Sequence, residues 1–333
     1  MAAYRSFGEQ SLHYFSRPHD DVPRVAVEGD AAWRGDALAD DESWRIALSR
    51  EQLTEIEHAI EFAIATGKPT GELDKRDFPI PSLKRTLDGV RADLMTGRGF
   101  ALLGGLPVEQ WPDAYAEVFF WCFGLHLGQP GGQNPAGDLL GHVTDTGARE
   151  SDEFVRLYQT SSHIAYHCDA ADVVGLLCKQ KAMSGGQSRI VSSVSVYNEL
   201  LRQRLDLAER LFEPMVLDVR DAKPTDKLRH FPVLPCRFAD GTLRTFYHSD
   251  YFRSAQRHDD VPRHTKTERE LLDLYEEIAL TPGMYLDMDL QPGDVQLVSN
   301  HSVLHARTEY AEWPEPDRKR HLLRLWLSLE REN

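Results

Sequence analysis

The second half of the sequence is a series of short apolar or alternating runs, each bounded by glycine, proline or aspartate. Runs of this kind are typical of strands that are separated by turns. Two segments with helical character, 196–211 and 266–279, interrupt the series. The pattern predicts a sandwich or a jelly-roll barrel, mainly β, with flanking helices packed on the outside. The expected strands cover residues 173–178, 188–194, 214–220, 231–237, 243–248, 284–288, 294–299 and 321–329.

The first part of the chain has a different sequence pattern, with mainly loops and helices in place of a series of short strands. Residues 17–45 are rich in Asp, Pro and Arg without periodicity, which indicates loops and a short strand at the edge of the fold. Ser49 and Gln52 have the spacing of a capping box, and the helix that follows should end at Gly67. Further helices are expected at 83–97 and 114–127, with a buried strand at 99–105.

No internal repeat and no long linker divides the chain. We therefore expect a single domain over residues 1–333. In it, residues 1–95 form an N-terminal loop and helical portion that packs on the barrel, and residues 96–333 form the jelly-roll core with helical insertions.

The charge and the cysteines restrict the kinds of partner. A formal net charge of −15 repels phosphate backbones and anionic lipids, so we expect neither nucleic acid nor membrane as a partner. No stretch reaches the ~18 apolar residues of a membrane span, and no signal peptide is recognisable. The four cysteines include no CxxC pair, which fits a reducing compartment. We expect a cytoplasmic protein with a small-molecule substrate, and a homo-oligomer is compatible with the sequence.

A histidine and an aspartate lie two residues apart in the run SSHIAYHCDAADVVGLLC. In a strand, His167 and Asp169 would share one face, while the residues between and before them point the other way. The best candidate for a third ligand is His305, in GDVQLVSNHSVLHAR. Two histidines and one carboxylate leave metal positions open, as in non-haem Fe(II) oxygenases. A buried hydrogen-bonded His–Asp pair is the alternative interpretation.

Two arginines occupy the C-terminal run RHLLRLWL, where Arg320 and Arg324 share one strand face. A guanidinium inside an apolar barrel is costly unless it pairs with a carboxylate, so the pair indicates a bound diacid and a second anion. Surface arginines on an edge strand are the alternative. The segment SGGQSRIVSS, which follows the HxD motif after one strand length, ends in hydroxyls that could bind a carboxylate.

Together these motifs resemble the TauD/TfdA-like Fe(II)/2-oxoglutarate-dependent dioxygenases, relatives of taurine dioxygenase and clavaminate synthase, over roughly residues 95–329. The resemblance implies a double-stranded β-helix, a cupin-like jelly roll. It implies that the catalytic residues His167, Asp169 and His305 ligate the metal, Fe(II). By the same resemblance Arg320 binds 2-oxoglutarate, assisted by a hydroxyl for which Ser192 is the nearest match, and Arg324 contacts an anionic substrate.

Other residues compete for some of these roles. A second HxD motif, His248 to Asp250, could supply the ligands, but the GGQS turn and the long stretch to His305 accompany the first motif. Asn134 and Tyr158 precede the metal strand and are expected to bind substrate at the pocket mouth, with ordinary loop capping as the alternative.

The expected reaction uses O2 and 2-oxoglutarate to hydroxylate an unactivated carbon and releases succinate and CO2. The substrate would be a small carboxylate, an amino-acid-like molecule or a natural product. Two alternatives remain open: a zinc-dependent hydrolase that uses the same three ligands, and a non-catalytic jelly-roll ligand-binding module.

Overall fold

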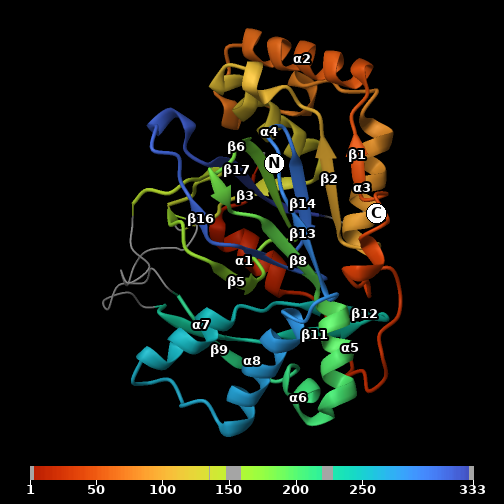
Figure 1. The fold of residues 1–333 in the computed structure, drawn as a ribbon, viewed down its shortest axis with the longest axis vertical. Coiled ribbons are helices and arrows are strands. Elements are labelled where there is room, and N and C mark those ends of the chain that lie inside the picture. The colour runs from red at the N-terminus through yellow and green to blue at the C-terminus, as the bar shows by residue number, and fades with distance from the viewer. Residues whose placement is uncertain (1–3, 135, 148–158, 220–227, 330–333) are drawn as a thin grey trace.

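The computed structural model describes residues 4–134, 136–147, 159–219 and 228–329 (Figure 1). Its centre is two facing sheets with helices on both outer sides. The larger sheet has seven strands in the order β1-β2-β14-β6-β17-β3, and β4 also pairs with β17. These strands are β1 (Arg45–Ala47), β2 (Phe100–Gly104), β3 (Gln129–Gly131), β4 (Gly141–Val143), β6 (Val173–Gln180), β14 (Val295–Ser299) and β17 (His321–Ser328).

The smaller sheet has four strands in the order β13-β8-β15-β5. They are β5 (Ile164–His167), β8 (Ser188–Ser192), β13 (Tyr285–Met288) and β15 (Val303–Arg307). Three two-stranded antiparallel pairs lie outside these sheets. The pairs are β7 (Ser184–Gly185) with β16 (Tyr310–Ala311), β9 (Met215–Asp218) with β10 (His230–Val233), and β11 (Cys236–Ala239) with β12 (Thr242–Thr245).

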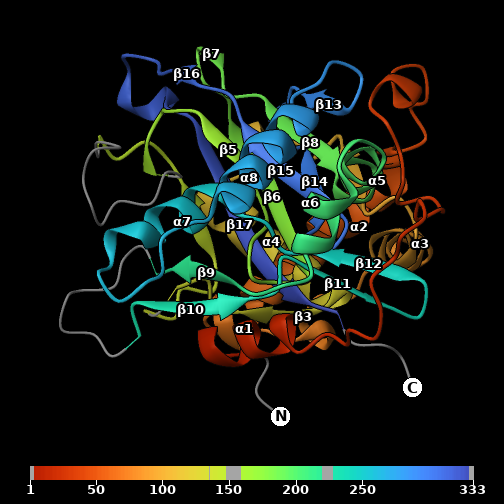
Figure 2. The same cartoon turned by 90° about the horizontal axis from the view of Figure 1, so that it is seen from below.

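The helices fall into two groups that cover the outer faces of the sheets (Figures 1 and 2). Against the larger sheet lie α2 (Arg50–Ala65), α3 (Lys84–Thr96) and α4 (Asp113–Leu127). Against the smaller sheet lie α5 (Ser193–Gln203), α6 (Leu205–Arg210), α7 (Ser249–Ser254) and α8 (Lys266–Ala279). The N-terminal helix α1 (Phe7–Phe15) lies beside β3 and close to β10, below the sheets in Figure 2.

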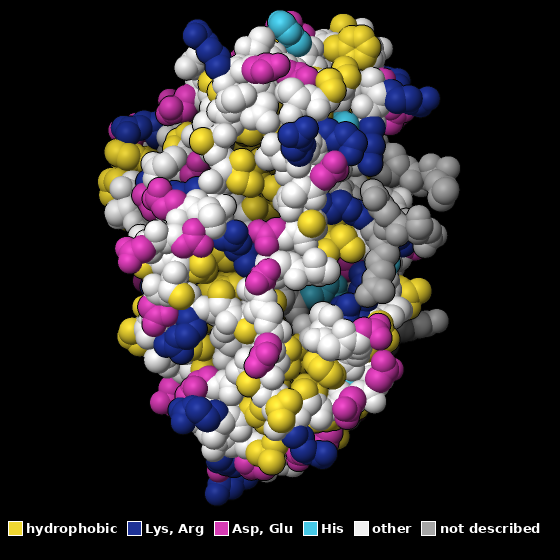
Figure 3. Space-filling model, turned by 90° about the vertical axis from the view of Figure 1, so that its right-hand side faces the viewer, with side chains coloured by type: hydrophobic (Ala, Val, Ile, Leu, Met, Phe, Trp, Pro, Cys, Tyr) yellow, Lys and Arg dark blue, Asp and Glu magenta, His cyan; other side chains and the backbone are white. Residues whose placement is uncertain are grey.

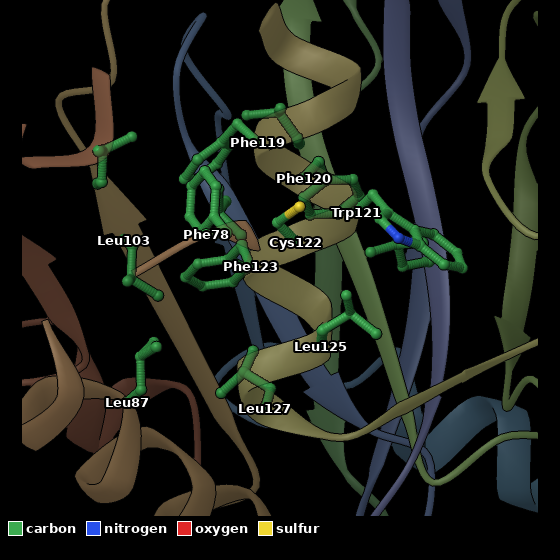
Figure 4. Close-up of a cluster of buried hydrophobic side chains, with 14 of the residues drawn as sticks. Phe78, Leu87, Leu103, Phe119, Phe120, Trp121, Cys122, Phe123, Leu125 and Leu127 are labelled. Carbon is green, nitrogen blue, oxygen red and sulfur yellow. The ribbon is translucent and has the colours of Figure 1, made fainter. Parts of the chain in front are cut away.

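The alternation of side chains along the strands separates three apolar layers. In β2, Ala101 and Leu103 face α4, whereas Phe100 and Leu102 face the smaller sheet. Helix α4 is apolar on almost every side, which is the pattern of a helix buried all round, and ten of its fifteen residues are buried. In Figure 4, Phe123 lies on the side of α4 that faces Leu87 of α3 and Leu103 of β2, and Trp121 lies on the other side of the helix. The larger sheet is therefore covered on both faces.

Most of the expected elements are present, with two splits. The predicted helix over 196–211 divides into α5 and α6 at Arg204, whose φ of −149° is not helical. The predicted strand over 231–237 divides into β10 and β11 around Pro235, which has no N–H to donate to a ladder. Helix α1 was not predicted, although Ser6 and Glu9 form a capping box that the sequence SFGE already contains.

On the face shown in Figure 3, acidic and basic side chains are interspersed, and no large area carries one sign of charge. In the part of the chain that the structure describes, no helix combines the length and the hydropathy that a bilayer crossing requires.

Candidate metal and cofactor site

Three predicted ligands come together where β5 and β15 pair. His167 lies directly opposite His305 in this antiparallel pair, and their ring centroids are 4.2 Å apart. Asp169 follows the end of β5, and one ligand atom from each of the three residues lies within 4.8 Å of the other two. Among the described residues this is the one group of His, Cys, Asp and Glu side chains with such geometry. A single ion between them would contact all three.

Neighbouring groups fix the orientation of these ligands. The Nδ1–H of His167 donates to the carbonyl of Ala165 (2.9 Å), since a carbonyl can only accept, and this leaves Nε2 with its lone pair for a metal. The indole Nε1–H of Trp326 donates to Asp169 Oδ2 (2.9 Å). The backbone N–H of Asp169 donates to the side-chain oxygen of the fully buried Asn300 (3.0 Å).

The surroundings of Asp169 and His305 favour the protonation states in which these side chains bind metal. Burial alone would raise the pKa of Asp169, but Arg324 and the two imidazoles more than offset it, so the pKa of this carboxyl is lowered. Burial, together with the neighbouring His167, lowers the pKa of His305 to about 3. A carboxylate and a neutral imidazole are the forms in which Asp169 and His305 act as ligands.

A small pocket of about 70 Å³ opens beside the three ligands. Three arginines line it, and two of them are almost fully buried: Arg320 is 5% exposed and Arg307 is 6% exposed. Both guanidinium groups lie over the ring of Tyr310, at 5.1 and 4.8 Å from its centroid. Nη1 of Arg320 and both Nε and Nη1 of Arg307 have no hydrogen-bond partner among the described residues.

These unpaired N–H groups test whether the pocket suits 2-oxoglutarate. Buried charged donors are costly unless a ligand accepts from them, and a dicarboxylate supplies charged acceptors. The metal ligands border the same pocket, so a molecule bound there reaches both the arginines and the ion. The residues present therefore fit both Fe(II) and 2-oxoglutarate.

The structure corrects the choice of hydroxyl. The Ser192 hydroxyl donates to the carbonyl of Ala31 (2.5 Å) and accepts from the N–H of Ser195 (3.0 Å), so it caps α5 and does not line the pocket. The serine that lines the pocket is Ser188, at the other end of β8, whose hydroxyl donates to Gln296 Oε1 (2.9 Å).

The glycine pair before Ser188 brings this strand end close to Arg320. Gly185 and Gly186 have φ values of +74° and +72°, which L side chains rarely adopt. A Cβ on Gly186 would lie 3.1 Å from Nε of Arg320. The turn in GGQS therefore permits a close contact that a side chain would obstruct.

A second, larger pocket of about 700 Å³ meets the small one at the metal ligands. Four residues line both pockets: Ile164, His167, Asp169 and Arg324. Most of the remaining wall is apolar and comes from α1, from β9 and β10, and from the segment between β12 and α7. Arg320 lines only the small pocket.

Of the two residues expected at the pocket mouth, the structure describes only Asn134. Asn134 lines neither pocket, and its side chain forms two hydrogen bonds with Asp138 in a loop, as in the alternative interpretation of loop capping. Its neighbour Gln133 is 1% exposed and accepts from Nε of Arg324 (2.7 Å). Tyr158 lies outside the described residues.

The competing motif contributes a neighbour rather than a metal ligand. His248 forms an isolated backbone bridge with His167 and lines the large pocket, with its ring stacked on Tyr251 (3.6 Å). His301, four residues before His305, does not join the three predicted ligands, because its Nε2 forms a hydrogen bond with Asp172 (2.7 Å).

Comparison with known proteins decides the family. A model of the family described as "Taurine catabolism dioxygenase TauD, TfdA family" matches residues 65–326. The chain belongs to this family. As a TauD/TfdA family member it is a 2-oxoglutarate-dependent dioxygenase that uses Fe(II).

Related family members have a similar length. FR-33289 synthase from Streptomyces rubellomurinus is 29% identical over 313 residues, which is 93% of this chain and 92% of the relative. A taurine hydroxylase-like protein from Stachybotrys chartarum is 26% identical over 311 residues, 90% and 79% of the two chains. Among solved structures, an asparagine oxygenase complex has a TM-score of 0.67 at 17% identity and covers 86% of this chain and 93% of its own. The non-haem iron oxygenase OrfP has a TM-score of 0.61 at 15% identity, with 85% and 93% covered.

Proposed function

We propose that this dioxygenase hydroxylates an unactivated carbon of a small substrate that carries a carboxylate or a similar anionic group. An amino-acid-like molecule or a natural-product intermediate is the substrate class, and succinate and CO2 are the products from 2-oxoglutarate. The observation that carries the proposal is the meeting of a small, arginine-rich pocket and a larger, mostly apolar one at His167, Asp169 and Arg324. Bound Fe(II), with 2-oxoglutarate and O2, would supply the oxidation chemistry.

We assign metal and 2-oxoglutarate binding to residues of the small pocket and substrate binding to the large one. His167, Asp169 and His305 hold the ion, with Trp326 and the Ala165 carbonyl orienting the ligands. Arg320 binds the distal carboxylate of 2-oxoglutarate through the N–H that has no other described partner, and Ser188 lies in the same pocket. Arg324 borders both pockets and is held by Gln133, so it can bind a polar group of the substrate close to the ion.

We further propose that the two facing sheets form the family's double-stranded β-helix and that residues 1–333 act as one domain. The contribution of β1 to the larger sheet and of α1 to the large pocket supports a single unit, because the N-terminal residues complete both. The four cysteines are free and buried, which supports a place in the reducing cytoplasm.

Two similar proteins support a small-molecule substrate. The asparagine oxygenase structure contains Fe(II), 3-hydroxyasparagine and succinate. An OrfP structure contains Fe and alpha-ketoglutaric acid. A zinc-dependent hydrolase could use the same three ligands, but it would leave Arg320 and Arg307 facing a pocket with nothing to bind.

Anaerobic spectroscopy tests the proposal. Fe(II) and 2-oxoglutarate added to the metal-free protein should produce a visible metal-to-ligand charge-transfer band. Arg320→Gln should raise the 2-oxoglutarate concentration needed for half of the band by about tenfold or more, because a charge-assisted hydrogen bond is lost. Arg318→Gln is the matched control, since Arg318 is exposed and pairs only weakly with Glu315 (3.9 Å). A folded parent protein without the band, together with unchanged iron binding by His167→Ala, would overturn the proposal.

A further inference from the structure

Part of the wall of the large pocket is aromatic, and the aromatic residues there do not line the small pocket. Phe15 of α1 makes edge contacts with Phe231 of β10 (5.9 Å between ring centroids) and with Phe246 (4.9 Å). Aliphatic side chains continue this wall: Leu12, Leu217, Val219, Leu228 and Val233. A wall of this composition gains by covering apolar surface of a ligand, and a volume of about 700 Å³ lies within the range of pockets that hold drug-sized molecules.

Among the described residues, two acidic side chains line this pocket, Asp169 and Asp218. Asp218 has a fully buried side chain, and it accepts from Nε2 of His258 (2.8 Å) and from the hydroxyl of Ser254 (2.7 Å). It also forms an ion pair with Arg257 (3.1 Å). Asp169 belongs to the group of side chains that could hold the metal, and its Oδ2 accepts from Nε1 of Trp326. Neither carboxylate is therefore placed to bind a cationic ligand.

Arg237 is different, because it offers charge to this pocket. It lies on β11 and lines the large pocket but not the small one. Its Nη1–H donates to the carbonyl of Leu234 (3.1 Å), and it forms no ion pair with any carboxylate of the described residues. Burial lowers the pKa of Arg237, which reflects the cost of keeping this cation in apolar surroundings. An anionic ligand would offset that cost.

We propose that the substrate is an acid with an extended apolar body, whose acidic group binds Arg237 while the body lies against the Phe15, Phe231 and Phe246 wall. This inference rests on the proposed function for the chemistry at the metal, and it deepens that function by naming the substrate class. Arg324, which lines both pockets, binds a polar group beside the metal ligands, and Arg237, which lines only the large pocket, binds the acid.

Binding of simple amphiphiles to the metal-free protein tests this inference. Octanoate and 1-octanol have the same chain length and differ in charge at neutral pH. Isothermal titration calorimetry should show octanoate binding at least about tenfold more tightly than 1-octanol, because only the carboxylate pairs with a guanidinium. Butyrate, which has the charge but little apolar surface, should bind more weakly than octanoate.

Variants assign the preference to one arginine. Arg237→Gln should remove most of the advantage of octanoate and leave 1-octanol unchanged, and Arg237→Lys should restore part of it. Arg202→Gln is the matched control, because Arg202 is exposed on α5 and pairs with Glu199. It should bind both probes like the parent protein.

Three results would overturn the inference: no octanoate binding, equal binding of the two probes by the parent, or a preference that Arg324→Gln removes and Arg237→Gln retains. The parent comparison needs no variant, so it stands even if Arg237→Gln fails to fold. These measurements contain neither iron nor 2-oxoglutarate. Failure here is therefore distinguishable from failure of the charge-transfer experiment, which tests the proposed function itself.

Discussion

Replacement of Trp326 by Phe should weaken metal binding while the protein stays folded. The indole Nε1–H donates to Asp169 Oδ2 over 2.9 Å, at a carboxylate whose side chain is 12% exposed. A hydrogen bond to a charged group in such a place contributes about 1.5–3 kcal/mol, and loss of a group that orients a metal ligand typically lowers affinity 10- to 100-fold. Phe retains most of the apolar contact, so we expect Trp326→Phe to raise the Kd for Fe(II) about 10- to 100-fold.

The chain offers a close control for this experiment. Trp44 belongs to the same buried cluster as Trp326 and is 4% exposed, but its Nε1 has no hydrogen-bond partner among the described residues. Trp44→Phe therefore removes similar volume without removing a bond to a ligand. Anaerobic competition with a chelator of known affinity measures the Kd of each protein. Equal Kd values for Trp326→Phe and the parent, or an equal loss in Trp44→Phe, would refute the reasoning.

Three further outcomes can be measured. Gly186→Ala should raise the KM for 2-oxoglutarate about tenfold, because the new Cβ would press on Arg320 and the φ of residue 186 is +72°. Gly241→Ala is the control, since Gly241 has the same φ but open space around it, and its KM should stay unchanged. Equal KM values for the two variants would contradict this prediction. Asp172→Asn should lower the free energy of unfolding by about 3 kcal/mol in urea titrations. The Asp172 carboxylate accepts hydrogen bonds from four groups: the side chains of His13, Arg17 and His301 and the N–H of Leu329. A change below about 1 kcal/mol would exclude a structural role for this carboxylate. Burial lowers the folded-state pKa of His305 to about 3 and of His321 to about 4, so the unfolded chain binds more protons below pH 6.5. Each histidine should therefore lower the free energy of unfolding of the metal-free protein by up to about 2 kcal/mol between pH 7 and 5, and less for His321, which is partly exposed. His321→Gln should lose less stability over this range than the parent, and an unchanged pH dependence of the variant would contradict this reasoning.

Local patterns in the sequence predicted most of the elements. The capping box at Ser49 and the apolar spacing behind it predicted α2 because helix signals lie within one or two turns of chain. The spacing of His167 and Asp169 indicated one shared face, and the structure brings both to one point with His305. These inferences depend on contacts between near neighbours or on one long-range pairing that the family pattern supplied.

The hydroxyl could not be chosen from the sequence in the same way. Ser188 and Ser192 have the same parity in β8, so alternation places both on one face. They lie about 13 Å apart along the strand, and only the end at Ser188 adjoins Arg320. Which end adjoins the arginine depends on the pairing of β8 with β15 and on the glycine turn before it, and both are long-range features.

The wall of the large pocket also could not be predicted from patterns between residues that are close in sequence. A capping box at Ser6 marks α1, but nothing near it in the chain shows that Phe15 would meet Phe231 and Phe246. Phe15 is more than 200 positions from both of these residues in sequence, and it meets them only when the whole fold has formed. The same holds for Gln133 and Arg324, which are 191 positions apart.

The two pockets have only four residues in common, and this has a consequence for how such an enzyme can diverge. The cofactor pocket is built mainly from paired strands, where a changed side chain disturbs several neighbours at once. The walls of the large pocket come from the N-terminal helix α1, from the two-stranded pair β9 and β10, and from connecting segments. Mutations in the walls of the large pocket can therefore change which substrate binds, while the small pocket and the oxidation chemistry stay the same.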